Sequence, residues 1–269
     1  MRIILTILAI TTLTAGQTIP VPLEDGEGTR PSGVTISGTP PGQIRLTTGY
    51  RTQIGDERPF SLLSGEISEE SMVLKTGDKL AEGKIGWGFG VALETSVQNP
   101  FHFSIGFDGQ YGTFDYVSFS IGAGYNYQLI SNKLWAQVKS DFLLGKINFE
   151  LGNLPDVSGN TNILGSTFTG KNINTTISAG TIMVRPELNI FLRLRPRGLL
   201  MFGSGYQLPL SKPEFKVIFE GKDISNEEIS ENTSLTSSEV SLVLDEKKVN
   251  TIDISPKGLV LSISWIFEL

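Results

Sequence analysis

His102 and Ser104 are the residues whose types and spacing could most directly perform chemistry in this 269-residue chain. Side chains two positions apart in a strand point to the same face, so the His-Phe-Ser spacing places an imidazole beside a hydroxyl. An imidazole that takes the proton of a hydroxyl is the core of nucleophilic catalysis, and a carboxylate usually orients it. Whether the pair could act depends on which face of the strand it occupies.

Metal and phosphate chemistry have little support in the sequence. There is no cysteine and no second histidine, so scattered carboxylates alone could at most hold Ca²⁺. Gly86, Gly88 and Gly90 look like a nucleotide-binding loop, but they alternate strictly within a predicted strand and no helix follows. The net charge of -6 argues against nucleic acid. We expect no metal, no cofactor and no nucleic-acid partner.

Charges of both signs lie on the polar side of the predicted strands. If these strands enclose a narrow interior, the charges must pair or stay hydrated, because an unpaired buried charge is costly. They could form a structural ion-pair network or line a path for a small solute, and we favour the network. This predicted luminal polar network comprises Arg45, Glu94, His102, Asp108, Lys139, Asp141, Glu187 and Arg193.

Eight segments with a hydrophobic period of two must position these side chains. The last segment shows the period most clearly, with Leu261, Ile263 and Trp265 alternating with serines. Such a period is typical of a strand with one apolar face, and the lengths suit a transmembrane strand of about 9 to 11 residues. The predicted strands are residues 43–51, 84–95, 101–112, 117–129, 133–144, 181–194, 198–208 and 258–269.

The connections alternate strictly between two kinds. Tight turns are predicted at residues 98–100, 130–132 and 195–197, and the other connections, residues 52–83, 113–116, 145–180 and 209–257, are mostly long and polar. Short turns inside and long loops outside are typical of bacterial outer-membrane barrels. We therefore predict an all-β fold, a transmembrane antiparallel up-and-down barrel of eight strands. Ten strands stay an alternative, if the last outer loop or residues 71–74 join the wall.

Residue size indicates which face points outward. A soluble lipocalin-like barrel would also alternate, with its apolar side inward. Here the polar side is dominated by glycine and serine, which fit a narrow lumen, whereas the apolar side is too bulky to fit inside. We therefore place the apolar side against lipid, which turns His102 and Ser104 inward. Aromatic side chains should gather at the two membrane interfaces: Tyr50, Trp87 and Tyr206 at the outer one, and Tyr125, Tyr127, Trp265 and Phe267 at the periplasmic one.

The N-terminal residues predict export. Residues 1–16 have a basic start, an apolar run and small residues at the end, which is typical of a cleaved secretory signal. An uncleaved anchor is the alternative, but the run is shorter than a membrane span. Residues 17–42 predict a flexible, proline-rich periplasmic segment, and residues 43–269 the barrel.

With these features, the chain resembles the small outer-membrane β-barrel family of Gram-negative bacteria, of the eight-stranded type. The resemblance rests on the predicted signal, the eight strands and the C-terminal sequence Trp-Ile-Phe-Glu-Leu. It implies a monomer in the outer membrane, in contact with lipopolysaccharide and with the outer-membrane assembly machinery. Members usually end on an aromatic residue, whereas this chain ends on Leu269. The His-x-Ser spacing resembles that of outer-membrane lipid A deacylases, whose triad faces the lipid.

The last outer loop is the most individual segment. Residues 215–219 and 240–244 alternate on either side of an acidic stretch at residues 226–239, so we predict that these flanks pair as a hairpin that continues the last two strands. Such a hairpin could bind a partner or serve as a solvated cover. The sequence predicts a non-enzymatic barrel with a structural or surface-interaction role through its loops. The alternatives are a small-solute pore, a lipid A-modifying enzyme and a soluble binder.

Overall fold

The computed structural model describes residues 42–53, 60–64, 73–75, 85–153, 160–195, 198–235, 240–244, 247–249, 252 and 254–269. The predicted signal at residues 1–16 and the periplasmic segment at 17–42, except its last residue, lie outside the described residues. In the part of the chain that is described, no helix is long and apolar enough to cross a membrane.

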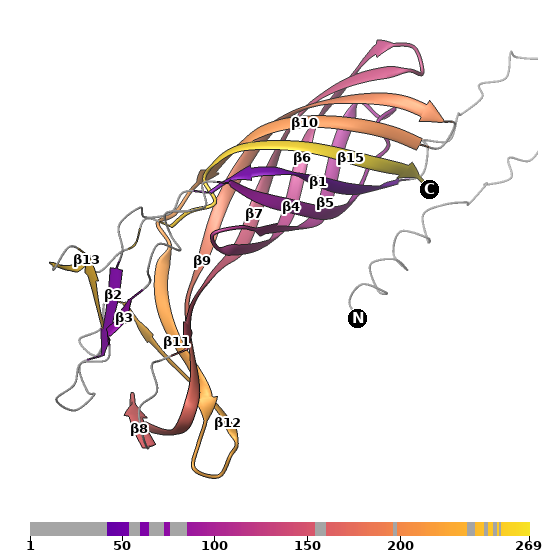
Figure 1. Ribbon diagram of the computed structural model, residues 1–269. Coiled ribbons are helices and arrows are strands. Elements are labelled where there is room, and N and C mark those ends of the chain that lie inside the picture. Colours follow the sequence, from indigo (N-terminus) through magenta and orange to yellow (C-terminus); the bar gives the residue numbers. More distant parts are fainter. Residues whose placement is uncertain are drawn as a thin grey trace, which may run out of the picture.

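Eight antiparallel strands form a closed ring (Figure 1). Each strand pairs with the next along the ring, β10 pairs with both β9 and β15, and β15 pairs with β1, which closes the wall. The predicted eight-stranded antiparallel barrel is therefore confirmed. In ring order the strands are β1 (Gln43–Thr52), β4 (Ile85–Glu94), β5 (Phe101–Tyr111), β6 (Asp115–Ile130), β7 (Leu134–Asn153), β9 (Ser166–Arg195), β10 (Gly198–Pro209) and β15 (Gly258–Glu268).

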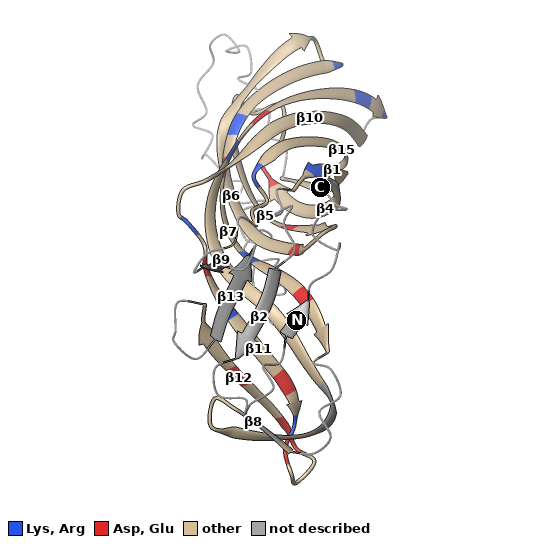
Figure 2. Ribbon diagram, turned by 60° about the vertical axis from the view of Figure 1, so that its left-hand side comes forward, with Lys and Arg blue, Asp and Glu red and all other residues tan. Residues whose placement is uncertain are grey.

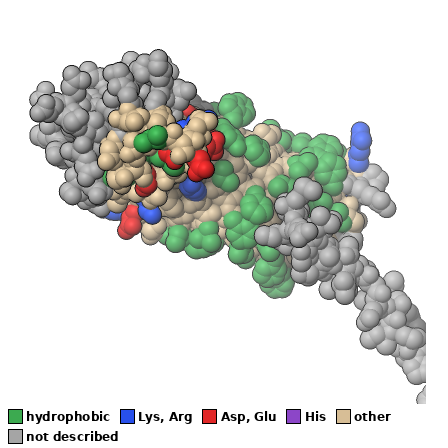
Figure 3. Space-filling model, turned by 90° about the horizontal axis from the view of Figure 1, so that it is seen from below, with side chains coloured by type: hydrophobic (Ala, Val, Ile, Leu, Met, Phe, Trp, Pro, Cys, Tyr) green, Lys and Arg blue, Asp and Glu red, His purple; other side chains and the backbone are tan. Residues whose placement is uncertain are grey.

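A band of hydrophobic side chains covers the outside of the barrel (Figure 3). Trp87, Phe101 and Phe103 are 67%, 61% and 60% exposed, while their neighbours Gly88, His102 and Ser104 point inward and are buried. A water-soluble monomer rarely exposes a continuous apolar band of this size. The arrangement is the reverse of a lipocalin-like barrel, so the alternative of a soluble barrel, whose apolar strand faces would point inward, is wrong.

Two barrel strands continue beyond the wall. Residues 145–180 are not the predicted loop, because β7 runs on to Asn153 and β9 begins at Ser166, and the two stay paired from Gly145↔Thr181 to Asn153↔Asn174. β8 (Asn160–Ile163) adds to the far end of β9. The many Asn, Thr, Gly and Ser residues suggested a loop, but the apolar alternation persists here and needs a paired backbone to bury it.

The predicted hairpin between residues 215–219 and 240–244 is wrong. β11 (Glu214–Lys222) pairs instead with β9 and with β12 (Glu228–Ser234), which lies within the acidic stretch. A tight turn joins β11 to β12, in which the Glu227 amide donates to the Asp223 carboxylate at 2.8 Å and Asn226 has a φ of 65°. Asn and Asp favour such turns, and a nearby strand costs less chain entropy to pair than a distant one.

Residues 240–244 belong to a second, four-stranded sheet. Its order is β14 (Lys247–Val249), β13 (Val240–Leu244), β2 (Phe60–Ser64) and β3 (Val73–Lys75), and Figure 1 shows it at the same end of the molecule as β11. Figure 2 shows β11 and β12 extending below the barrel wall. Neither β3 nor β13 joins the ring, so the wall has eight strands and not ten. We call β8, β11, β12, the outer parts of β7 and β9 and this second sheet together the head.

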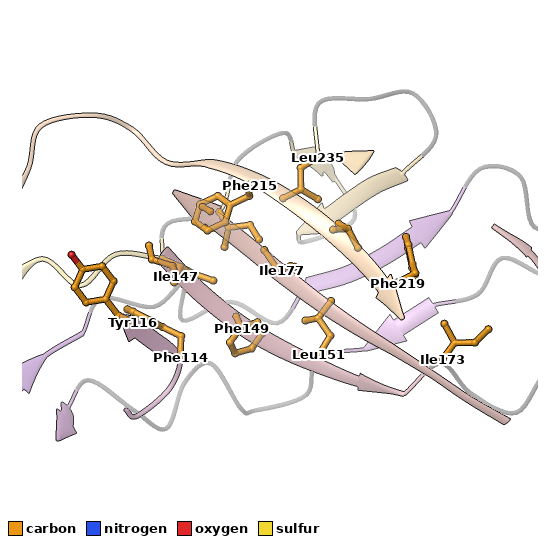
Figure 4. Packing of buried hydrophobic residues seen from close by; sticks show 14 of the residues in the cluster. Phe114, Tyr116, Ile147, Phe149, Leu151, Ile173, Ile177, Phe215, Phe219 and Leu235 are labelled. Atoms are coloured by element: carbon orange, nitrogen blue, oxygen red, sulfur yellow. The ribbon is translucent and has the colours of Figure 1, made fainter. Parts of the chain in front are cut away.

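The head has its own hydrophobic core (Figure 4). Alternate residues of β7, β9 and β11 supply it, among them Phe149, Ile177 and Phe219, which are all but fully buried. Tyr116, Leu143 and Met183 belong to the same cluster but point into the barrel, so the core continues from the head into the barrel mouth. We call this end of the barrel the head end, and the opposite one, where β1 begins and β15 ends, the terminal end.

Pro186 lies within β9 without causing a β-bulge. It pairs with Ser140 of β7 and points outward, and the register between β9 and β10 is the same on both sides of it. Pairs are missing there only between Glu187↔Gly205 and Val184↔Leu208. The missing proline N–H therefore interrupts one ladder without shifting the strand.

Candidate functional site in the barrel interior

A layer of ion pairs fills the middle of the barrel interior. Arg185 lies at its centre: its Nη2 is 2.8 Å from Asp141 Oδ2 and 3.1 Å from Asp108 Oδ2, and its Nε is 2.6 Å from Glu187 Oε1. Lys139 Nζ also bridges Asp141 and Glu187, at 2.8 and 3.1 Å. These side chains are almost completely buried, apart from Asp108, whose side chain is 13% exposed, so the charges depend on their partners more than on water.

Two further pairs extend this layer toward the ends of the barrel. Arg51 Nη2 lies 3.3 Å from Asp108 Oδ1, and Arg45 Nε lies 3.5 Å from Glu94 Oε2. Glu94 also accepts a hydrogen bond from Gln43 at 3.0 Å. The central charged layer thus contains four basic and four acidic side chains and is neutral overall: Arg45, Arg51, Lys139, Arg185, Glu94, Asp108, Asp141 and Glu187.

Glycines on neighbouring strands make the room that these side chains occupy. A Cβ atom added to Gly90 would lie 2.7 Å from Asp108 Oδ1, and one added to Gly205 would lie 2.8 Å from Glu187 Cγ. Gly122 stands in the same relation to Asp141. Any larger residue would push the charged group away from its partners. The small residues of the polar face therefore act as individual niches for charges, beyond the general narrowness that the sequence predicts.

A chain of amides continues the polar interior toward the terminal end. Asn189 donates to Gln137 at 2.8 Å, Gln137 donates to Asn126 at 2.8 Å, and Asn126 donates to the backbone oxygen of Asn99 at 2.7 Å. Each of the two middle amides uses its oxygen and its nitrogen in opposite directions, which fixes the orientation of the whole chain.

Apolar layers lie on both sides of the charged layer. At the terminal end, a buried cluster consists of Val97, Trp135, Phe191, Leu199, Met201 and Ile266, each at most 1% exposed. At the head end, Tyr116, Leu143 and Met183 close the mouth. The sequence analysis did not predict this layering, because the apolar residues occupy the same inward-facing positions as the charged ones. Trp135 and Phe191, two large apolar residues on the otherwise polar face, were the signal that could have indicated it. The interior is thus apolar, charged and apolar in succession.

The predicted network residues do not all meet. Arg193 lies apart, at the terminal end, where its Nη2 is 2.7 Å from Glu268 Oε1 and its guanidinium carbon lies 5.3 Å from the centre of the Trp135 ring. Arg51 and Arg185 belong to the charged layer but were not predicted. Arg185 shares the inward parity of Glu187, on the other side of Pro186, and this parity was the available signal.

His102 and Ser104 point into the barrel, away from the lipid-facing side. His102 is fully buried, and neither ring nitrogen has a hydrogen-bond partner among the described residues. The nearest carboxylate oxygen, Glu94 Oε2, lies 3.9 Å from Nε2, beyond hydrogen-bond distance. A lipid acyl chain outside the wall has no access to this pair, so the arrangement differs from that of a lipid-facing triad. The described residues include no group of three or more His, Asp or Glu side chains that could hold a metal ion.

The predicted interface aromatics lie at the two ends of the apolar band. Tyr50 is paired in register with Trp87 at the head end, and their ring centres are 6.3 Å apart. Tyr206 lies at the same end, near the end of β10. At the terminal end, the rings of Tyr125 and Tyr127 are 4.7 Å apart and those of Trp265 and Phe267 are 6.2 Å apart.

Comparison with known proteins gives similar solved structures only. No protein-family model matches the sequence, and no curated protein matches it. Neisserial surface protein A is similar over 85% of this chain and 97% of its own, with 9% identity and a TM-score of 0.39. A major outer membrane protein of Thermus thermophilus gives 12% identity and a TM-score of 0.41, over 85% of this chain and 99% of its own. OprG of Pseudomonas aeruginosa gives 12% and 0.30, over 86% and 98%. The fold itself rests on the strand pairing described above.

Proposed function

We propose that this protein is a closed, non-enzymatic barrel of the outer membrane that holds a folded β-structured head at the cell surface and acts through that head. The observation that carries the proposal is the layered interior. A neutral set of ion pairs, sealed by apolar side chains at both ends, anchors strands that continue without a break into the head.

The outer surface of the wall supports the membrane placement. Exposed apolar side chains surround the barrel, and aromatic side chains lie at both ends of that band, where a bilayer meets water. The described connections at the terminal end, residues 95–100 and 131–133, are short, whereas the head extends from the other end. In outer-membrane barrels the short turns face the periplasm, so the head is outside the cell.

The packing of the interior argues against solute passage. Trp135 and Phe191 are 1% and 0% exposed at the terminal end, and Leu143 and Met183 are fully buried at the head end. An ion that crossed the barrel would have to displace these side chains and then break buried ion pairs, which is costly in a dry interior. The interior therefore serves to hold the barrel rigid beneath the head, and not to conduct a solute.

Conductance in planar lipid bilayers tests this proposal. We expect the wild-type chain, inserted from detergent, to give no stable current steps. A Trp135→Ala/Phe191→Ala variant opens one apolar layer only, so it should also stay closed because the charged layer and the head-end layer remain. Steady wild-type current that changes with Lys139→Gln would overturn the proposal and establish a solute path.

Surface display of the head is tested separately on intact cells. A short epitope placed in the turn between β11 and β12, after Ile224, lies at an exposed tip, since Ile224 is 68% exposed. We expect an antibody to label intact cells. Labelling only after the outer membrane is permeabilised would place the head on the periplasmic side and refute the orientation.

A further inference from the structure

An open groove lies where the barrel wall meets the head. It has a volume of about 770 Å³ and is bordered by β7, by β9, by β11 and by the connection from β10 to β11. Gly180 forms its floor: it is paired in register with Lys146 on one side and Glu214 on the other, and a Cβ atom added to it would meet nothing within 4 Å. A residue without a side chain between two long ones leaves a depression in the sheet.

The groove is basic in an acidic protein. Lys146, Lys212 and Lys216 line it together with one carboxylate, Glu214, and all four side chains are exposed. No ion pair joins any of the three lysines to a described residue. The groove therefore carries a net charge of +2, three lysines against one glutamate, while the whole chain carries -6. Such a local excess attracts a multiply charged anion.

The edge of the groove that lies nearest the apolar band of the barrel is itself apolar. Leu144 and Ile182 line it, and they are 46% and 38% exposed on the outward, lipid-facing side of the barrel. Leu144 lies two residues before Lys146 on the same face of β7, so the apolar band ends where the lysines begin. A ligand that satisfies both parts must carry an acyl chain and an anionic head.

We propose that this groove binds the phosphate of a phosphorylated glycolipid in the outer leaflet, with the three lysines on the phosphate and an acyl chain along Leu144 and Ile182. The proposal rests on the outer-membrane placement proposed above. Phosphate is the anion of such headgroups, and a lysine ammonium binds it as a compact point charge. A basic side chain near an anionic lipid surface strengthens binding about fivefold, which makes roughly a hundredfold for three.

Native mass spectrometry of the folded full-length chain tests this site with three probes: a bisphosphorylated lipid A, the same glycolipid without phosphates, and inorganic phosphate. The test variant is Lys146→Gln/Lys212→Gln/Lys216→Gln. The matched control, Lys133→Gln/Arg195→Gln/Lys222→Gln, removes three basic groups elsewhere on the described surface. The unboiled gel mobility and strand spectrum of each protein show that it has folded.

We expect bisphosphorylated lipid A to stay bound to the wild type and the control, and its affinity to fall at least about tenfold in the test variant. Equal binding by the test variant would overturn the site. So would equal binding of the phosphate-free glycolipid, which would leave apolar contact only, or full competition by inorganic phosphate, which would make it a site for free anions. If the wild type does not insert into lipid vesicles at all, the proposed membrane placement is wrong. That result differs from the case in which the barrel folds and inserts but its lipid binding does not depend on the phosphate, which refutes the groove alone.

Discussion

Replacing Arg185 with methionine removes the centre of the charged layer while keeping a side chain of similar length. Arg185 contacts three carboxylates, on Asp108, Asp141 and Glu187, at distances between 2.6 and 3.1 Å. After the substitution the layer holds three basic groups against four acidic ones. One carboxylate is then left without a full partner. Water cannot take the place of that partner, because the side chains of Arg185 and Asp141 are only 2% and 1% exposed in the wild type.

Removing one partner of a buried ion pair costs about 3 to 5 kcal/mol, because the other charge stays desolvated. We therefore expect the free energy of unfolding to fall by about that amount. It can be measured by urea unfolding in lipid vesicles, followed by tryptophan fluorescence. Trp87 is 67% exposed on the outward face, so its emission reports the loss of lipid contact.

A second substitution separates charge balance from packing. In Arg185→Met/Asp141→Asn the remaining contacts become three separate pairs: Arg45 with Glu94, Arg51 with Asp108, and Lys139 with Glu187. We expect this double variant to regain more than half of the lost stability. Arg195→Met is the matched control, since Arg195 is exposed at the terminal end. If Arg185→Met unfolds at the same urea concentration as Arg195→Met, the ion pairs do not support the barrel and the reasoning is wrong.

Four further substitutions test other parts of the molecule. Gly122→Ala should destabilise the barrel by about 1 to 3 kcal/mol in the same urea assay, because the new methyl group overlaps Asp141 and Ser104, whereas Gly180→Ala, which meets open space, should leave the midpoint unchanged; equal effects would refute the niche interpretation. Ile177→Asp buries a charge in the head core, so limited proteolysis should cut the head while the gel mobility shift of the barrel persists. If the substitution abolished the mobility shift as well, the head and the barrel would form a single cooperative unit. Ser104→Ala should leave the acyl-chain pattern of lipid A unchanged by mass spectrometry, since Ser104 faces the interior, and a changed pattern would restore the enzyme hypothesis.

The wall could be predicted from the sequence because membrane exposure makes the signal strong. An outward residue such as Phe103 must be apolar and its neighbour must fit a narrow interior, so each strand can be recognised within about ten residues. The same logic gave the correct inward direction of His102. It gave no information on which charges meet, because partners such as Asp108 and Arg185 lie on strands that are far apart in the ring.

The head could not be predicted in the same way. The outer parts of β7 and β9 are buried on one side only, and the outer part of β9 is rich in Asn, Thr and Ser, a composition that also suits loops. The pairing of β11 depended on the turn at Asp223 and Asn226, which is a local signal, while the prediction followed the more hydrophobic but distant residues 240–244. Trp135 was missed for a related reason: the residues of a strand that point into the barrel do not have to be polar along its whole length.

The pairing of β1 with β15 brings together the two ends of the barrel sequence, from Gln43↔Glu268 to Arg51↔Val260. Without β15 the wall would be open between β1 and β10, and water would reach the eight charges of the central layer. Ile266 of β15 also completes the apolar layer at the terminal end. Burial of the eight charges therefore depends on closure of the wall, and a chain without its final strand would be an open sheet with two unpaired edges and hydrated charges rather than a weaker barrel.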